Sequence, residues 1–168
     1  PVTVDALPGT FTFNEVRPGS FELDGTTIHV ADVPHVGPTV GYRVERNGVS
    51  VAYISDHQQP GCGSMDVADA VLELCAGVDL LIHDAQYTDE EFAKKADWGH
   101  CTVDYAVNVA AKAGARRLAL FHHDPLHGDS LLDEFGDHAA RSGASLGLDE
   151  VLVAAEGMKV SLGSAAGH

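Results

Sequence analysis

The chain has few of the features that mark secreted or membrane proteins. Its three cysteines, Cys62, Cys75 and Cys101, are odd in number and widely spaced, so neither a disulfide framework nor a zinc knuckle is indicated. No apolar run reaches the roughly 18 residues that a membrane helix needs, and the start does not resemble a secretory signal. We therefore expect a cytoplasmic protein with reduced thiols and no membrane partner.

Positive charge is scarce as well. Ten Lys and Arg residues stand against 25 Asp and Glu residues, which gives a formal net charge of -15. A field of that sign repels polyanions unless a metal ion or a local basic patch overcomes it. We therefore expect a small substrate rather than long nucleic acid. The composition, 45% hydrophobic and 21% charged, suits one domain with a core of its own.

The first third of the chain predicts antiparallel strands joined by tight turns. Asp24-Gly25 is a turn signal, and Asn47-Gly48 is the strongest short-range signal for a hairpin. The residues around both pairs alternate between apolar and polar, as they do in a strand with one buried face. The strands expected from this alternation are residues 11–13, 21–23, 26–33, 41–46 and 49–55.

After about residue 64 the hydrophobic period becomes that of helices. Thr88-Asp-Glu-Glu91 is a capping box that opens a helix, and Gly77 and Gly114 are helix stops. Hairpins followed by alternating strands and helices indicate an α/β (α+β) fold with a mixed sheet covered by helices. The expected helices are residues 67–75, a helix from 88, 102–113 and 130–141, and the expected strands are 79–82, 117–121, 150–153 and 158–162.

Three apolar strands each end in histidine and aspartate. Packing alone does not explain imidazoles at the exits of core strands, whereas ligand groups collect where strands of an α/β domain end. Taken singly, each residue has an ordinary interpretation: His35 as a turn residue and Asp56 as a turn cap. Together the three strand ends predict one wall of a metal site. The pairs are Asp56-His57, His83-Asp84 and His122-His123, with Asp124 and His127 following the third.

Five motifs in order resemble the metallo-β-lactamase superfamily, and most closely its phosphodiesterase and tRNA 3′-processing ribonuclease branch. The resemblance runs from about residue 20 to residue 162 and implies an αββα sandwich, of which this chain would supply the C-terminal half, with its mixed sheet and covering helices. The motifs are His35 ahead of Gly41-Tyr-Arg-Val-Glu, Val51-Ala-Tyr-Ile-Ser-Asp56-His57, Leu80-Leu-Ile-His83-Asp84-Ala85, Gly99-His100-Cys101-Thr102 and Phe121-His122.

The resemblance implies a role for each matching residue. His35 matches a ligand of the first metal ion, Asp56 the carboxylate that bridges both ions, and His122 a ligand of the second. His100 matches the histidine near the leaving group, and Asp84 the acid that orients it. Two divalent ions are implied, Zn²⁺ first, with Mn²⁺ or Fe²⁺ also compatible with such ligands. Three further histidines match no ligand position and are interpreted as supporting or surface groups: His57, His123 and His127.

One departure from the family pattern limits what the chain is expected to do alone. The signature run His-x-His-x-Asp-His should precede His35, but His29 is the only histidine between Pro1 and Pro34. Each ion then keeps two of the ligands named above, whereas a zinc site normally has at least three from protein. We therefore expect one incomplete domain over residues 1–168, with a lead-in over 1–25, a core over 26–162 and a tail over 163–168.

An incomplete sandwich also predicts a partner. Without the other half, apolar sheet residues would be exposed, and an exposed face of that size calls for a cover. The cover would be a polypeptide carrying the missing half or a second copy of this chain in a dimer; a clipped chain with its other half still bound is equally compatible. The residues expected on the exposed face are Ile28, Val40, Val44, Ala52 and Ile54.

The function expected for the assembled domain is hydrolysis of a small phosphodiester, such as a cyclic nucleotide, by metal-activated water. His100 favours phosphodiester chemistry because a poor alkoxide leaving group needs a proton. Two alternatives stay open. One is a catalytically degenerate half-domain that dimerises or binds a partner, and the other is an esterase or thioesterase that uses the same metal ions.

Overall fold

A computed structural model describes residue 3, residues 7–61 and residues 63–163 of the chain. Cys62 and the tail from 164 onward lie outside the described residues. The described part contains one seven-stranded sheet in the order β1-β2-β3-β4-β5-β6-β7. The elements are β1 (Gly19–Leu23), β2 (Thr26–Asp32), β3 (Val40–Arg46), β4 (Val49–Ile54), α1 (Asp69–Cys75), β5 (Leu80–Asp84), α2 (Asp89–Lys95), α3 (Val103–Ala113), β6 (Arg117–Phe121), α4 (Asp129–Ser145) and β7 (Glu150–Val153).

Strands β1 to β4 form an antiparallel meander. Both predicted turns are present, since Asp24-Gly25 joins β1 to β2 and Asn47-Gly48 joins β3 to β4. All four turn residues have positive φ, between 50° and 76°, as a tight hairpin turn requires at both central positions. The Asx-Gly pairs therefore fix the register of the first half of the sheet.

Strands β4 to β7 are parallel, and helices connect them. Thr88 and Glu91 form the predicted capping box at the start of α2. Thr102 accepts the Tyr105 N–H at the start of α3, and Gly114 ends that helix in the left-handed conformation. The predicted mixed sheet with strand-helix alternation is thus confirmed.

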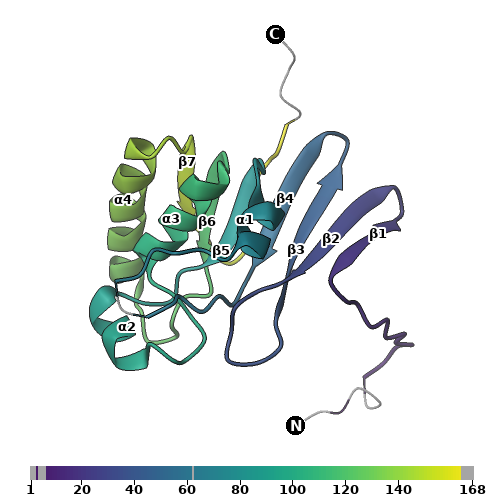
Figure 1. Cartoon of the computed structure of the whole chain (residues 1–168), viewed down its shortest axis with the longest axis horizontal. Helices are drawn as coiled ribbons and strands as arrows, with labels where there is room; N and C mark the ends of the chain where they lie inside the picture. Colours follow the sequence, from purple (N-terminus) through teal and green to yellow (C-terminus); the bar gives the residue numbers. More distant parts are fainter. Residues whose placement is uncertain (1–2, 4–6, 62, 164–168) are drawn as a thin grey trace.

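The helices α1, α3 and α4 pack against one face of the sheet (Figure 1). Because side chains alternate along a strand, one set of strand residues faces these helices and the other set faces away. The core between sheet and helices contains Ala52, Ile54, Leu81, Leu118 and Leu120 from the strands, together with Val71, Leu74, Tyr105, Val109, Phe135 and Ala139 from the helices.

The opposite face of the sheet has no covering helix within the described part of the chain, but its residues differ from those expected. Ala52 and Ile54 were predicted there and are instead buried beneath the helices. The pairing explains the error, because Val44 lies opposite Val51 and Val51 alternates with Ala52 along β4. The open face carries Phe21, Leu23, Ile28, Val40, Val44, Val51, Tyr53 and Ile82.

Other expectations differ at the ends of the chain. Residues 11–13 and 158–162 form no strand in the structure. Past β7, the N–H of Ala154 donates to the carbonyl of Leu120 and Arg117 donates to the carbonyl of Ser161, but these two bonds do not form a strand ladder. Helix α4 runs to Ser145 rather than Arg141.

Cys75 and Cys101 are buried free thiols. Among the described residues, no helix is long and apolar enough to cross a membrane.

The two faces predict different costs for truncating a strand residue. Ile54→Ala removes a side chain that is 1% exposed, and should lower the free energy of unfolding by about 2–5 kcal/mol. Val44→Ala acts on a side chain that is 37% exposed, and should cost under about 1 kcal/mol. Urea unfolding of both variants at low protein concentration measures the difference. An equal loss would mean that the open face is covered in the protein as it exists.

Candidate metal centre

The three strands that end in histidine and aspartate are neighbours. Strand β4 pairs in parallel with β5, and β5 with β6, so their carboxyl ends meet at one edge of the sheet. Strand β2 runs in the direction of β4, because two antiparallel pairings separate them. Its following loop, which carries His35, therefore reaches the same edge. These loops gather at the end of the sheet where α2 lies (Figure 1).

The structure brings four of the predicted residues into one cluster. One ligand atom each from His35, Asp56 and His100 lie within 4.8 Å of one another. Nε2 of His122 lies 3.6 Å from Oδ1 of Asp56. The Asp56 carboxylate therefore lies among imidazoles that come from separate loops. Imidazole and carboxylate at this spacing suit Zn²⁺, Mn²⁺ or Fe²⁺.

His100 occupies the middle of the cluster. Its ring stacks on that of His122, with centroids 4.9 Å apart, and meets the edge of the His35 ring at 5.8 Å. Its Nδ1 lies 2.8 Å from Oδ2 of Asp84. With Nδ1 bonded to Asp84, the other ring nitrogen, Nε2, is the atom left to act in the site.

The protonation of His100 follows from these neighbours. Burial disfavours the charged imidazolium, but the hydrogen bond to Asp84 and the negative charges of Asp84 and Asp56 favour it more. The net effect raises the pKa of His100 above its usual value. The shift favours the protonated imidazole, which a proton donor requires.

Asp84 is fully buried at the end of β5, and its carboxylate is surrounded by donors. Oδ2 accepts the backbone N–H of His57 at 3.0 Å as well as pairing with His100, and Oδ1 accepts the N–H of Gln86 at 3.1 Å. A buried charge with three such partners is stabilised and held in one orientation.

His57 and His83 are buried behind the cluster and outside it. Nδ1 of His57 lies 2.9 Å from Nε2 of His83. Burial, together with the neighbouring His83, lowers the pKa of His57 to about 2, and burial also lowers the pKa of His83. Both rings are therefore neutral, and they pack beneath the strand ends as a supporting layer.

His123 and His127 also stay outside the cluster. Nε2 of His127 lies 2.9 Å from a carboxylate oxygen of Glu91, and Lys95 pairs with Asp124 at 3.0 Å. These two contacts tie α2 to the loop that follows β6. Burial lowers the pKa of His123.

Gln58 is a site residue that sequence reasoning missed. Its side-chain amide donates to the carbonyl of Ala96 at 2.7 Å, and its carbonyl accepts the N–H of Gly99 at 2.8 Å. One side chain, two residues after Asp56, thus holds both ends of the turn that leads to His100. A glutamine that follows a metal-ligand candidate carries no sequence signal of this role, because its partners are backbone atoms about 40 residues away.

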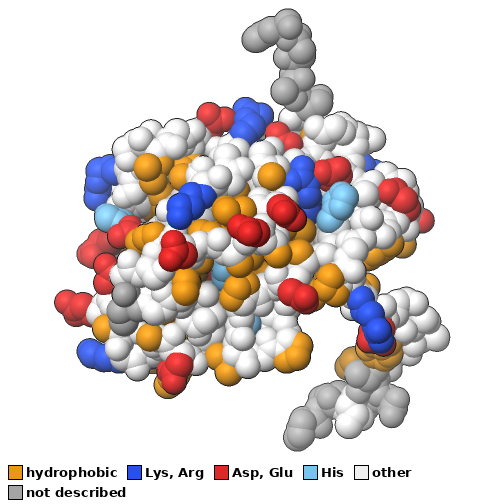
Figure 2. All heavy atoms as spheres, viewed as in Figure 1, with side chains coloured by type: hydrophobic (Ala, Val, Ile, Leu, Met, Phe, Trp, Pro, Cys, Tyr) orange, Lys and Arg blue, Asp and Glu red, His pale blue; other side chains and the backbone are white. Residues whose placement is uncertain are grey.

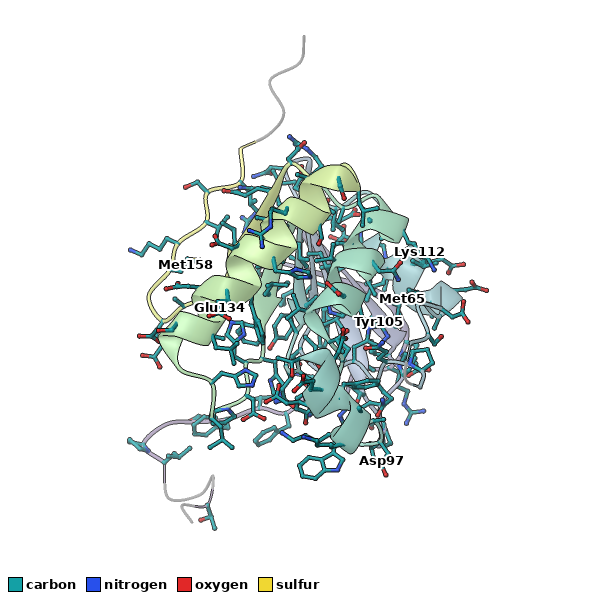
Figure 3. All side chains as sticks on the ribbon, turned by 90° about the vertical axis from the view of Figure 1, so that its left-hand side faces the viewer. Met65, Asp97, Tyr105, Lys112, Glu134 and Met158 are labelled. Atoms are coloured by element: carbon teal, nitrogen blue, oxygen red, sulfur yellow. The ribbon has the colours of Figure 1, made fainter. Side chains whose placement is uncertain are left out.

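Gln59 fastens the other side of the same segment. Its backbone N–H donates to the carbonyl of His100 at 3.2 Å, and its side-chain oxygen accepts the N–H of Thr102 at 3.1 Å. The loop that carries both glutamines is itself held on α3. Tyr105 donates to the carbonyl of Asp66 and Lys112 to the carbonyl of Met65, and Figure 3 shows Met65, Tyr105 and Lys112 side by side.

Two backbone features show how closely the loops fit around the cluster. His122 has φ 58°, a left-handed conformation that is rare for a side-chain-bearing residue and typical of functional sites. Gly99 has φ 100°, and a Cβ there would lie 2.7 Å from Cδ2 of His35 and would overlap its Nε2. The His35 ring therefore occupies space that only glycine leaves free.

Comparison with known proteins identifies relatives of this arrangement. A family model described as "Beta-lactamase superfamily domain" matches residues 2–123. Ribonuclease Z of Nocardia farcinica (strain IFM 10152) is 34% identical over 106 residues, which are 63% of this chain and 29% of that protein. The chain spans between 24% and 49% of the length of the ribonuclease Z proteins it matches.

Solved structures agree on the fold. The metallo-beta-lactamase fold protein YhfI from Bacillus subtilis superposes with a TM-score of 0.65 at 20% identity, over 85% of this chain and 52% of that one. The short form of human tRNase Z gives a TM-score of 0.60 at 25% identity, over 84% of this chain and 45% of that one. The sheet and its helical layer therefore recur in both proteins.

The contact between Gly99 and His35 predicts a specific loss. Gly99→Ala should lower the free energy of unfolding by about 1–3 kcal/mol more than Gly77→Ala does, and should weaken Zn²⁺ binding because the His35 ring must move. Gly77 is the matched control, since its φ is also positive, at +61°, but nothing lies within 4 Å of its added Cβ. Urea unfolding and Zn²⁺ calorimetry measure both effects. Equal losses in the two variants would contradict the close fit of His35.

Proposed function

Because this chain belongs to the beta-lactamase superfamily, in its ribonuclease Z-like branch, we propose that it is part of a metal-dependent hydrolase that cleaves phosphodiester bonds in RNA. The observation that carries the proposal is the position of His100, whose Nδ1 bonds to the buried Asp84. The same ring lies against His35 and His122.

The residues proposed to hold divalent metal are His35, Asp56 and His122. The complete domain is proposed to hold two ions, with Zn²⁺ the first choice of metal. In support, one ring nitrogen of His35 lies within 4.8 Å of an Asp56 carboxylate oxygen, and Nε2 of His122 lies 3.6 Å from Oδ1 of Asp56. Bound there, a divalent ion supplies Lewis-acid polarisation of a phosphoryl oxygen and acidifies water. His122 has a left-handed backbone conformation, and a ligand role gives a reason for retaining such a strained conformation at this position.

His100 is proposed to donate a proton from Nε2 to the leaving oxygen. The Asp84 carboxylate holds Nδ1, which fixes the ring orientation, and it raises the pKa of the imidazole so that the proton is available. Gln58 and Gln59 hold the backbone on both sides of the ring. Proton donation matters most when the leaving group is a sugar alkoxide, which is the case in RNA.

The choice of RNA over a small phosphodiester rests on the relatives, which are named ribonuclease Z. The net charge of -15 pointed the other way, because an acidic surface repels a polyanion. Bound divalent ions change the local field, however, since they are the largest charges in such a site. A substrate that is engaged close to the metal ions can therefore overcome the charge on the rest of the surface.

The remaining metal ligands are proposed to come from a polypeptide that carries the His-x-His-x-Asp-His run and packs on the open face of the sheet. In support, three protein ligands are the usual minimum for one zinc ion, whereas His35, Asp56 and His122, with Asp56 shared, give each of two ions only two ligands. The open face is apolar, with Phe21, Leu23, Val44 and Tyr53 all exposed. The single domain expected over residues 1–168 would be the C-terminal part of that assembly.

Metal binding can be tested on this chain alone. His122→Gly should remove a ligand and also relieve the left-handed strain, so the free energy of unfolding without metal should stay equal or rise by about 1 kcal/mol, while Zn²⁺ affinity falls at least about tenfold. Calorimetric titration and urea unfolding supply the two numbers. His138→Ala, which removes an exposed histidine paired with Asp104, is the control. Unchanged affinity in His122→Gly would overturn the ligand assignment.

The role of His100 is tested with two substrates in the complete assembly. His100→Ala should lower kcat by about 10²–10⁴ for a phosphodiester with an alkoxide leaving group, because the departing oxygen loses its proton donor. With a nitrophenolate leaving group, which needs no proton, the loss should be far smaller. His138→Ala again serves as the control. Equal losses with both substrates would contradict proton donation, and no loss with either would favour the esterase reading.

A further inference from the structure

Trp98 is an unusual side chain to find at the edge of this site. It is the only tryptophan in the chain, and it lies in the loop between α2 and α3, two residues before His100. The side chain is 61% exposed. A large aromatic ring left in water is a feature of recognition surfaces rather than of folding, because burial is where such a ring stabilises a protein.

The backbone around Trp98 is held firmly although the ring is exposed. Gln58 bonds to Ala96 on one side of it and to Gly99 on the other. The N–H of Trp98 also donates to the carbonyl of Lys95 at 3.0 Å. Little backbone conformational entropy is therefore left to lose when something binds to the ring, which favours a preorganised contact.

The ammonium group of Lys95 lies over the indole ring of Trp98. The Lys95 ammonium lies 5.6 Å from the centroid of the Trp98 ring and 4.6 Å from that of Tyr87. Asp124 pairs with this ammonium at 3.0 Å, so the charge of Lys95 is balanced within the protein. Lys95 thus supports the ring and leaves the exposed part of the indole as the contact surface.

The location places Trp98 beside the candidate metal centre. Its neighbour Gly99 is in contact with His35, and the adjacent Asp97 projects from one end of the molecule in Figure 3. The other two loops that carry a site histidine each present an exposed apolar side chain too. Val36, which follows His35, is 68% exposed, and Leu126, four residues after His122, is 89% exposed. Each of the three loops that carry a site histidine therefore presents an exposed apolar side chain, and we call Val36, Trp98 and Leu126 the apolar rim.

The acidic surface of the protein indicates which part of an RNA substrate the apolar rim binds. Acidic side chains are spread over the face seen in Figure 2, with no continuous basic patch there to track a phosphate backbone. Base stacking on an aromatic ring needs no positive charge and works for any base. We propose that Trp98 is a stacking platform for a nucleobase next to the scissile phosphodiester of an RNA substrate. This inference rests on the proposed function, and it names the part of the substrate that the site recognises.

The single tryptophan makes the contact directly measurable, because all indole fluorescence comes from Trp98. The probes are a single-stranded tetraadenylate RNA and the same tetramer without bases, titrated into this chain at low salt. The tetraadenylate should quench the fluorescence saturably, and the abasic tetramer should not. Trp98→Ala should weaken the affinity for a fluorescein-labelled tetraadenylate by about tenfold, measured by anisotropy, whereas Trp98→Phe should keep most of it. Leu146→Ala, an exposed apolar truncation at the end of α4, should bind as the parent does.

The outcomes separate this inference from the proposed function. Absence of quenching, equal quenching by the abasic tetramer, or an unchanged affinity in Trp98→Ala would each overturn the platform. If the tetraadenylate binds through Trp98 but the complete assembly does not cleave RNA, the hydrolase proposal fails and Trp98 stands only as a base-stacking contact. If RNA is cleaved and Trp98→Ala leaves both KM and kcat unchanged, the platform fails and the hydrolase stands.

Discussion

The carboxylate of Asp84 is the constraint on which the rest of the site depends. It is fully buried, and an unpaired buried charge would cost several kcal/mol, on the order of the stability of a whole domain. Its donors come from three places in the chain: His57 after β4, Gln86 after β5 and His100 before α3. Satisfying one buried charge therefore fixes the relative positions of the loops that carry the candidate ligand Asp56 and the candidate proton donor His100.

The two glutamines extend this arrangement outward. Gln58 and Gln59 lie two and three residues after Asp56, and they hold the backbone on both sides of His100. A displacement of the β4 loop would move the metal-ligand candidate and the proton donor together, so their separation is preserved. The same bonds hold the backbone of Trp98. A chain with little positive charge can in this way position an aromatic contact and a catalytic group from one loop.

The sequence predicted what depends on local pattern. Asp24-Gly25 and Asn47-Gly48 predicted both hairpins because positive φ is a property of those residues, and the histidines at strand ends predicted a shared edge because parallel strands end together. Ala52 and Ile54 were placed on the wrong face, since the face depends on pairing across strands. Gln58 could not be predicted, because an amide side chain reveals nothing of the distant backbone atoms it will bind. Residues 158–162 alternate like a strand but form no strand ladder, and the described bond from the sheet to this segment comes from the Arg117 side chain.

The missing metal ligands and a cover for the apolar face of the sheet can both be supplied by one polypeptide, because they are needed at the same place in the fold. Asp84, at the end of β5, is on the same face of that strand as Leu80 and Ile82, which is the face without helices. In the proposed assembly, a polypeptide that covers this face would bring its metal ligands to the same edge. An ion held by both parts stabilises their association, by about 2.7 kcal/mol at a hundredfold excess over the dissociation constant. By linkage, association strengthens metal binding equally, so weak metal binding by this chain alone is what the proposed assembly requires.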